Sequence, residues 1–280
     1  EFVKYSKYKT FNKILKAYKK NYFFGVHWGA SFENTSKFNF ENIDLNFAYK
    51  EMLPDLDLNN NTILPFITRS FIPSDIFKED KKIEKKYDVI TVTRKVNVKF
   101  NLDLFNIYRE LIKQNPQIKI LILVSNPNYV KSNFDHLFDD NFNNILGNFD
   151  NVELVNFREV PEQTIIAKSL QKSKMFLFTS RKEGGVKVTA EAALCNLPVL
   201  VNKSFFGGAR VGINPKYLFE YDSISSAVKY INAYTNPSAH LDKVFMRDLI
   251  DKENLLQLNK SLESFYKIKN RSFEGRLDTL

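Results

Sequence analysis

The chain has 280 residues, of which 44% are hydrophobic, so it can bury the core of one large domain or two small ones. Its single cysteine and three histidines exclude an internal disulfide and offer no cluster at metal-ligand spacing, which suits a reducing, cytoplasmic setting. The formal net charge of +9 would attract an anionic partner, but the richness in Lys, Asn, Ile and Phe is typical of biased gene composition, so charge alone does not indicate nucleic-acid binding.

The first 80 residues predict a short or incomplete α/β region. One helix near the N-terminus is indicated by apolar residues at helical spacing: Phe11, Ile14, Leu15 and Tyr18. A strand is expected at residues 22–26, a second helix at residues 43–52 and a second strand at residues 63–67. The polar, charged segment 78–86 is the best candidate linker to the larger part of the chain.

From Tyr87 onward, short apolar runs alternate with longer helical patterns. The first strand is expected at residues 89–92, and Asn101 is placed to cap the helix that follows it. That helix should end near Pro116, and its buried side is predicted from the helical spacing of Leu102, Phe105, Tyr108, Leu111 and Ile112. Residues 118–124 are almost continuously apolar, as in an internal parallel strand that helices cover on both faces.

The same alternation continues through the middle of the chain. Strands are expected at residues 152–157, 175–178 and 198–201, and a helix at residues 188–194. Another helix should have Pro161 in its first turn, and its predicted buried side is Ile165, Ile166 and Leu170.

Two more amphipathic helices are expected towards the C-terminus. Their apolar residues are Ile224, Val228 and Ile231 in the first, and Leu255, Leu258, Leu262, Phe265 and Tyr266 in the second. The order of all these elements predicts an α/β fold with a Rossmann-like parallel sheet flanked by helices. We divide the chain into a short N-terminal region, residues 1–80, and a larger domain, residues 81–280, which includes the C-terminal helices.

Residues 179–201 (TSRKEGGVKVTAEAALCNLPVLV) contain a strand end, a glycine-containing turn, a helix and a further strand in succession. Backbone N–H groups at a helix start are unpaired and lie at the positive end of the helix dipole, so they suit a diphosphate. Gly184 and Gly185 would permit its close approach. Glu183 precedes the turn and Glu191 lies on the helix; one could accept hydrogen bonds from sugar hydroxyls and the other from ribose hydroxyls, with no metal needed.

The segment EGGVKVTAE, followed by Pro198-Val199, resembles the E-x7-E and proline-valine signature of glycosyltransferase family 4 and related retaining enzymes with the GT-B fold. Upstream, Arg94 and Lys99 are similar in spacing to the Arg and Lys of that family's G-R-x-x-x-x-K segment. The resemblance covers roughly residues 87–231, including the Gly-Gly pair at 207–208 after the proline-valine strand. It implies a GT-B-type fold in which this part of the chain binds the sugar donor.

Several positions depart from the family pattern. Thr93 and Phe100 stand where the family usually has glycine before the Arg and after the Lys. Its Gly-Phe-Gly turn is Gly184-Gly185-Val186 here, and Ser125-Asn126 replaces a glycine-rich turn. These changes leave the donor identity and the loop geometry open, but they do not disturb the Arg-Lys and Glu-Glu spacings.

The resemblance implies a role for each matching residue. Arg94 and Lys99 would neutralise the donor diphosphate and stabilise the charge that accumulates as it departs, and Glu183 would hold the donor sugar; these three are the candidate catalytic residues. The other implied donor-binding residues are Gly184, Gly185, Val186 and Lys187 at the phosphates, Glu191 at the ribose and Val160 near the base. No metal ion and no cofactor are expected, because the nucleotide sugar is a substrate.

Two further residues have functional and structural interpretations. His27, beside Trp28 and Gly29, is a candidate on the acceptor side, because histidine can move protons near neutral pH and tryptophan can stack on a sugar. A partly buried strand end is the alternative that we favour for His27. Cys195 lies on the helix after the motif and is interpreted as a small packing residue rather than a nucleophile.

The sequence therefore predicts a hexosyltransferase-type enzyme that moves a sugar from a nucleoside-diphosphate sugar to a hydroxyl acceptor, such as a glycan or a lipid-linked saccharide. Retention of the anomeric configuration is implied by the resemblance. Family members bind the acceptor on an N-terminal domain, and about 80 residues is short for one, so we expect a piece of a longer enzyme or a compact relative. No apolar run approaches the roughly 20 residues of a membrane span, so any membrane contact would be peripheral.

A second class of function remains open at this point. The chain could be a non-catalytic basic module that binds sugar nucleotides or nucleic acid without a complete acceptor domain. No recognised nucleic-acid motif is present in the sequence, so nucleic acid is not the expected partner.

Overall fold

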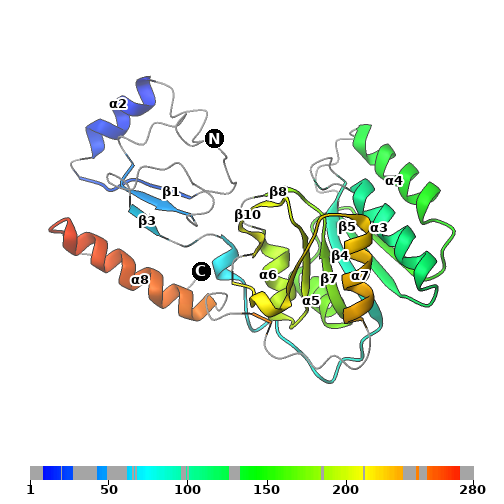
Figure 1. Ribbon diagram of the computed structural model, residues 1–280. Helices are drawn as coiled ribbons and strands as arrows, with labels where there is room; N and C mark the ends of the chain where they lie inside the picture. The colour runs from blue at the N-terminus through cyan, green and yellow to red at the C-terminus, as the bar shows by residue number, and fades with distance from the viewer. Residues whose placement is uncertain are drawn as a thin grey trace.

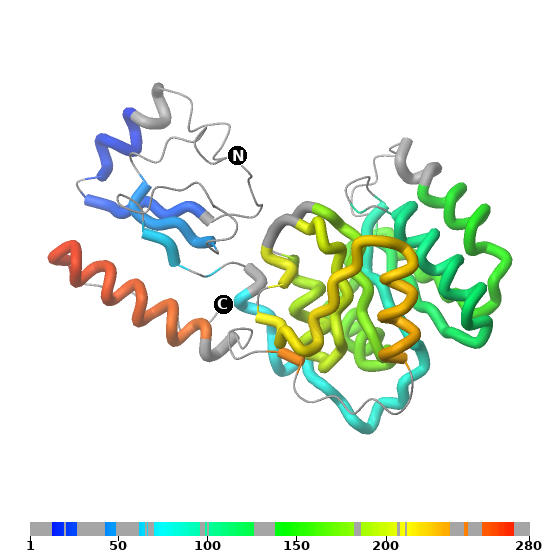
Figure 2. Tube along the Cα trace, in the orientation of Figure 1, coloured from blue at the N-terminus to red at the C-terminus, as the bar shows by residue number. Residues whose placement is uncertain are grey.

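The computed structural model describes residues 9–19, 21–27, 43–48, 62–64, 66, 68–95, 99, 101–125, 133–183, 186–210, 212–235, 244–245 and 251–271. These residues form two lobes (Figures 1 and 2). The larger lobe is built on a parallel sheet, and the smaller lobe contains the first described helix, three short strands and the last helix.

The large lobe is organised by a six-stranded sheet in which every neighbouring pair is parallel. Its strands, in chain order, are β4 (Tyr87–Arg94), β5 (Ile120–Ser125), β6 (Val152–Phe157), β7 (Ser173–Phe178), β9 (Val199–Asn202) and β11 (Leu218–Tyr221). Each strand predicted in this part of the sequence is present. The expected Rossmann-like parallel sheet is therefore confirmed.

The strand order across the sheet is β11-β9-β7-β4-β5-β6. Strand β4 is the first strand of this sheet in chain order. The chain then adds β5 and β6 on one side of β4, and returns to add β7, β9 and β11 on the other side. The direction of winding therefore reverses between β4 and β7. Ligands of open α/β sheets bind outside the carboxyl ends of the strands at such a reversal, so this topology selects one place on the lobe for a site.

Five helices accompany the sheet: α3 (Asn101–Gln114), α4 (Asn133–Ile145), α5 (Gln163–Gln171), α6 (Lys187–Leu194) and α7 (Ile224–Tyr234). Two hydrophobic cores form, one with α5 and α6 and the other with α3 and α7. Successive strand residues alternate between them, as Val89 packs in the α3 core and Ile90 in the α6 core. Helices thus cover both faces, which explains why these strands are apolar throughout.

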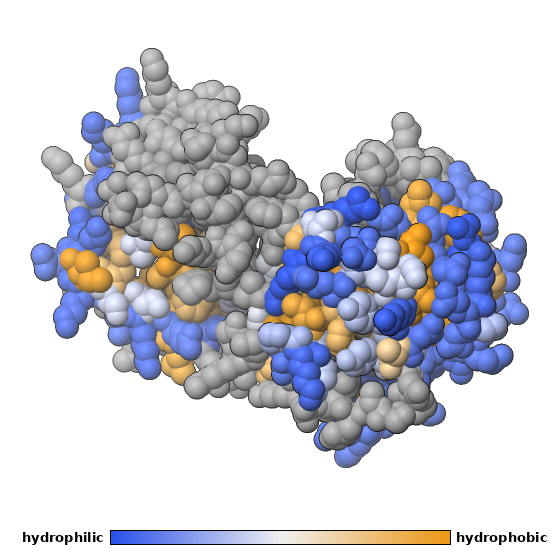
Figure 3. All heavy atoms as spheres, viewed as in Figure 1, coloured by the Kyte–Doolittle hydropathy of each residue, from blue (hydrophilic) through white to orange (hydrophobic). Residues whose placement is uncertain are grey.

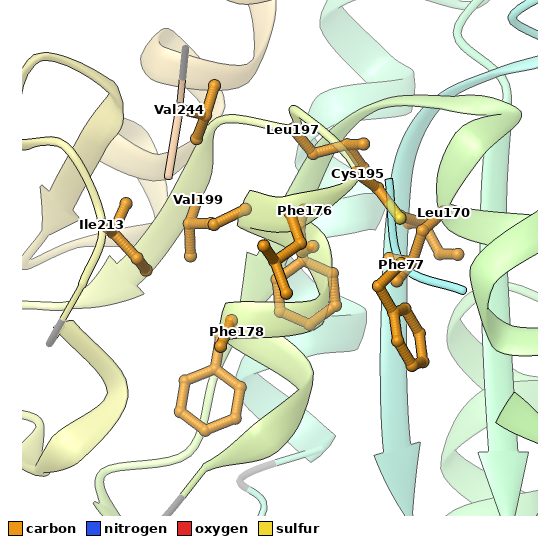
Figure 4. Close-up of a cluster of buried hydrophobic side chains, with 14 of the residues drawn as sticks. Phe77, Leu170, Phe176, Phe178, Cys195, Leu197, Val199, Ile213 and Val244 are labelled. Atoms are coloured by element: carbon orange, nitrogen blue, oxygen red, sulfur yellow. The ribbon is translucent and has the colours of Figure 1, made fainter. Parts of the chain in front are cut away.

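The hydrophobic core that contains α5 and α6 brings together distant parts of the chain, including the helix of the predicted donor segment. Figure 4 shows Phe77, Leu170, Phe176 and Leu197 in this cluster, and each comes from a different segment. On α6 itself three of the fully buried residues are alanines: Ala190, Ala192 and Ala193. Small side chains let this short helix pack closely on the sheet.

Three helix residues that the sequence pattern assigned to buried faces are exposed. Leu102, Ile165 and Ile224 are 52%, 40% and 40% exposed, so these assignments are wrong. All three lie in the first turn of their helices. Helical spacing fixes the side that a residue faces, but not how far along the axis the neighbouring element extends. The other residues of the three predicted stripes that lie deeper in their helices are buried.

Two helix starts also differ in detail from the prediction. Pro161 precedes α5, whose N-cap is Glu162, rather than lying in its first turn. Asn101 is the first residue of α3, and its side chain binds the end of β4 instead of capping the helix.

The small lobe contains α2 (Lys9–Tyr18) and a three-stranded parallel sheet with the order β1-β2-β3. Its strands are β1 (Gly25–His27), β2 (Leu45–Phe47) and β3 (Thr62–Leu64). The helix predicted at residues 43–52 is wrong at residues 45–47, which form the central strand. The apolar residues Ile43, Leu45 and Phe47 recur every second position, which is the period of a strand. On α2, Leu15 is buried, whereas Ile14 and Tyr18 are about half exposed.

The last helix, α8 (Asp251–Ile268), packs on the small lobe (Figure 1). Leu258 and Phe265 of α8 join a buried cluster with Leu45, Leu64 and Phe66. Near its start, the buried Asn254 side chain donates to the carbonyl of Ser70, 2.7 Å away, in the short helix η2 (Thr68–Phe71). Both ends of the described chain therefore contribute to the same lobe.

The face of the large lobe seen in Figure 3 is largely hydrophilic over its outer helices, with smaller apolar patches between them. Within the described ranges, none of the helices combines the length and the apolar character that spanning a bilayer requires.

Candidate functional site

Arg94 is the last residue of β4 and lies exposed at the carboxyl edge of the large sheet. Its backbone is held by Asn101, whose side-chain Nδ2 donates to the Arg94 carbonyl at 3.0 Å. The same side chain accepts, through Oδ1, a 3.0 Å hydrogen bond from the Thr93 hydroxyl. The start of α3 is thus tied to the end of β4, which fixes where Arg94 leaves the sheet.

Lys99 is linked across the winding reversal to the end of β7. The hydroxyl of Thr179, the residue after β7, donates to the Lys99 carbonyl at 2.9 Å. The Lys99 ammonium lies 5.8 Å from the centre of the ring of Phe178, the last residue of β7. Residues 80 positions apart are therefore joined at the point where the topology places a ligand site.

The electrostatic setting of Lys99 is unfavourable for its positive charge. Burial, and to a lesser extent the nearby Arg94 guanidinium, lower the pKa of Lys99 to about 8. The two cations predicted from the five-residue spacing therefore act on each other in the folded protein. Binding an anion beside them would offset both effects.

Glu183 ends the short strand β8 (Lys182–Glu183), after β7 and on the same edge of the sheet. This strand pairs in parallel with β10 (Phe206–Gly207), and Glu183 is opposite Gly207. The backbone of Glu183 is therefore fixed by the loop that follows β9. The turn residues Gly184 and Gly185, and the Glu183 side chain, lie outside the described part of the structure.

Helix α6 begins directly after that turn. Its N-cap, Val186, is extended (φ −65°, ψ 105°), buried and makes no side-chain cap hydrogen bond, since valine has no acceptor to offer. Lys187, the first helical residue, is exposed. The predicted succession of strand, turn and helix is present, with the helix N-terminus at the carboxyl edge of the sheet.

Glu191 lies on α6 and is only 6% exposed. Cys195, four residues later, is the C-cap of this helix, and its thiol is free and fully buried. Burial, together with the charge of Glu191, raises the pKa of Cys195 to about 12, so the thiol stays protonated at neutral pH. These surroundings suit the packing role expected for Cys195.

The last two candidates are less closely connected with this edge. Val160 lies after β6 in the segment that leads to α5, and it is 58% exposed. His27 ends β1 in the small lobe, so it belongs to a different sheet from Arg94 and Lys99, and its side chain lies outside the described residues. The structure thus brings Arg94, Lys99, the Glu183 backbone and α6 to one edge of the large sheet, whereas His27 is not part of that sheet.

Sequence reasoning missed Thr179, which joins β7 to the Lys99 segment. A possible signal was its place, since Thr179 and Ser180 are hydroxyl residues directly after a buried apolar strand, and both are buried. A surface pocket of about 420 Å³ lies elsewhere, between β3 and α8 in the small lobe. No group of three or more potential metal-ligating His, Cys, Asp or Glu side chains gathers among the residues that the structure describes.

No protein-family model matches this chain, and no curated protein matches it. Solved structures are similar to it. The pneumococcal O-GlcNAc transferase GtfA, in complex with UDP and GlcNAc, has a TM-score of 0.64 and 15% identity over 91% of this chain and 54% of that one. Anabaena HepE, in complex with UDP and glucose, has a TM-score of 0.60 and 15% identity over 79% and 64%.

A third similar structure is a UDP-forming α,α-trehalose-phosphate synthase from Burkholderia xenovorans, in complex with glucose-6-phosphate. Its TM-score is 0.67 at 11% identity, over 91% of this chain and 70% of that one. At identities this low, structural similarity establishes the fold alone. It confirms the GT-B-type α/β fold that the resemblance implied. The chain spans about half the length of GtfA.

Proposed function

We propose that this chain binds a nucleoside-diphosphate sugar and transfers the sugar, with retention, to a hydroxyl acceptor. The observation that carries the proposal is that Arg94, at the end of β4, and Lys99 lie beside the end of β7, where the chain continues into the Glu183–Glu191 segment, at the winding reversal of the sheet. Two cations and the amides at the start of a helix on one edge of the sheet are the groups that would bind a diphosphate.

Each residue has a separate part in the proposed reaction. Arg94 and Lys99, with the amides near Val186 and Lys187, would stabilise the departing nucleoside diphosphate as the glycosidic bond breaks. Glu183 would hold the donor sugar by accepting hydrogen bonds from its hydroxyls. The proposed ribose partner is Glu191, a carboxylate that can accept from two hydroxyls at once.

The remaining donor-binding roles follow the same layout. Gly184 and Gly185 would let the diphosphate approach the backbone closely, and Val160 would lie near the base. Because GtfA and HepE are complexes with UDP, we propose a uridine nucleotide as the donor. The proposal assigns no step to a metal ion or a cofactor, so donor binding should persist in the presence of a chelator.

The acceptor side is proposed to be the small lobe, with a glycan or a lipid-linked saccharide as the acceptor. Helix α2 exposes the apolar side chains of Ile14 and Tyr18 together with the ammonium-bearing residues Lys13 and Lys16. Apolar and basic residues on one helix suit the surface of an anionic membrane. This supports peripheral contact with a membrane that carries a lipid-linked acceptor.

The test of the proposed function is a thermal-shift comparison of UDP, GDP, ADP, TDP and their sugars, with the wild-type chain and Glu191→Ala. A ligand that binds the native state raises the melting temperature, and at about 100 times its Kd it adds roughly 2.7 kcal/mol. We expect UDP or a UDP-sugar to raise it in the wild type and to have a much smaller effect in Glu191→Ala.

Two outcomes would count against the proposal at different levels. If no nucleotide shifts the well-folded wild type, the donor site is refuted. If Glu191→Ala responds as strongly as the wild type, the donor site stands but the ribose role of Glu191 is wrong. A steeply salt-dependent affinity for nucleic acid, with no nucleotide shift, would favour the non-catalytic basic module instead.

A further inference from the structure

Arg210 holds the loop that follows β9. Its guanidinium donates to three backbone carbonyls, those of Phe205 at 2.7 Å, Lys203 at 3.1 Å and Asn202 at 3.2 Å. Its Nε also donates to the carboxylate of Glu220 on β11. One side chain therefore fixes the path of residues 202–205 and anchors that path to the sheet.

An aromatic contact leads from this loop towards Lys99. The Arg210 guanidinium lies 5.5 Å from the ring centre of Phe205, which is buried. The Phe205 ring meets the Phe178 ring edge to face, with 5.5 Å between centres. The Phe178 ring is the one that lies 5.8 Å from the Lys99 ammonium. Arg210, Phe205, Phe178 and Lys99 thus form a continuous series of contacts.

A backbone connection leads from the same loop to Glu183 and α6. Residues Phe206–Gly207 of β10 pair with β8, which places Gly207 opposite Glu183. The hydroxyl of the fully buried Thr189 on α6 donates to the Ala209 carbonyl at 3.0 Å. The loop that Arg210 holds therefore contacts both parts of the predicted donor segment.

We propose that Arg210 is a positioning residue for the donor site. It acts by holding the loop at residues 202–209, which packs against the residues of that site. It sets the place of Lys99 through Phe205 and Phe178, and the place of Glu183 through the pairing of β10 with β8. This inference rests on the proposed function, and Arg210 itself is not assigned contact with the donor.

Arginine is required here because of its shape. Its planar guanidinium presents five N–H donors in a fixed fork, which can serve several carbonyls and a carboxylate at once. A lysine ammonium is compact and has three donors on a flexible stem, so it would keep the charge but lose most of this arrangement. Arg210→Lys therefore tests whether the hydrogen-bonding geometry of the side chain matters when its charge is kept.

The experiment compares Arg210→Lys and Arg210→Ala with the wild type by UDP calorimetry and by hydrogen exchange followed over peptides. We expect faster exchange at residues 182–191 and 203–209 in both variants, and UDP affinity lower by roughly tenfold or more. Free guanidinium ion at a non-denaturing concentration should restore part of the affinity of Arg210→Ala, whereas ammonium should not. A purely structural loss of stability would give no such selectivity.

Lys174→Ala is the matched control at the opposite edge of the sheet. Lys174 is also a cation that binds a carboxylate and a backbone carbonyl, those of Asp88 at 2.7 Å and Thr235 at 3.3 Å. Its loss should lower stability without changing exchange at residues 182–191 or UDP affinity.

The outcomes separate this inference from the proposed function. Unchanged exchange at residues 182–191 in Arg210→Lys and Arg210→Ala would overturn the positioning role, whatever the nucleotide does. If the wild type binds no nucleoside diphosphate, the proposed donor site is refuted, and the exchange data still decide whether Arg210 holds the backbone of Glu183. Equal losses of affinity in Lys174→Ala and Arg210→Ala would also overturn the role.

Discussion

Lys99 lies where a positive charge costs free energy, and this makes it informative about the ligand. Burial and the guanidinium of Arg94 both disfavour its ammonium and bring its pKa to about 8. A bound diphosphate would favour the charged form and raise that pKa again. Binding and protonation at Lys99 should therefore be coupled above about pH 8.

The first prediction is a pH dependence of UDP binding. Below the pKa of free Lys99 the ammonium is already present, so the affinity should change little from pH 7 to about 8. Above it, binding must take up a proton, and the affinity should fall by up to about tenfold per pH unit. Calorimetric titrations across this range measure the slope directly.

Lys99→Met is the control for that slope. It keeps an unbranched chain beside the Phe178 ring but removes the titrating group. The variant should bind UDP more weakly at pH 7, with no further loss towards pH 9. A wild-type affinity that is flat across the range would contradict the role of Lys99 at the phosphates.

For the contacts of individual residues, the sequence was informative only where the residues belong to one short motif. The five-residue spacing of Arg94 and Lys99 predicted two neighbouring cations, and the structure has them interacting. The contact of Thr179 with the Lys99 carbonyl could not be predicted, since the two residues are 80 positions apart. The partners of Arg210 are backbone carbonyls, which every residue has, so no sequence pattern marks them.

Among the elements, each strand expected in the large sheet is present, whereas in the small lobe α2, β1, β3 and α8 were predicted but the central strand β2 was taken for part of a helix. Long apolar runs such as β5 are typical of internal parallel strands, and their alternation with helical patterns predicts a parallel sheet flanked by helices, though not the order of its strands. The strands of the small lobe have three residues each, which is too short for a period to be read reliably. Residues 45–47 were therefore misassigned.

A buried hydroxyl, that of Thr189, helps to join helix α6 to the β9 loop. Thr189→Val keeps the shape of the side chain but leaves the Ala209 carbonyl without the hydroxyl that donates to it at 3.0 Å. The free energy of unfolding should fall by about 1–3 kcal/mol, as is usual when a buried hydrogen bond loses one partner. Urea denaturation followed by circular dichroism measures this change.

The exposed Thr164 on α5 offers a comparison for the same substitution. Thr164→Val should change the free energy of unfolding by no more than about 0.5 kcal/mol. Equal effects at the two positions would show that the hydroxyl of Thr189 contributes nothing beyond its shape.

In the molecule as a whole, the last helix, α8, completes the core of the small lobe. Asn254 on α8 binds Ser70, 184 positions earlier, and Phe265 packs edge to face on Phe23 with 4.9 Å between ring centres. The apolar stripe of α8 could be predicted from its own spacing, but the surface that it covers could not. That surface is made by residues from the opposite end of the sequence.

Phe265→Ala should therefore weaken the small lobe. Removing a buried phenylalanine typically lowers stability by about 3–5 kcal/mol, and here the loss should appear as faster hydrogen exchange in β1 and β2. Exchange in β5, in the core of the large lobe, should stay unchanged. Ile268→Ala, at a position 76% exposed on the same helix, should alter neither region. Loss of protection in both lobes would mean that they unfold together.

The packing of α8 on the small lobe has a consequence for synthesis on the ribosome. In this chain β2 and β3 are translated before the large lobe, yet the cluster that buries Leu45 and Leu64 also needs Leu258 and Phe265 of α8. Domains generally fold as units while the chain emerges, so the large lobe can finish before the small one. Within this chain, the small lobe precedes the large lobe in the sequence but is the later of the two to complete its core, so its apolar strand residues are exposed for longer during synthesis.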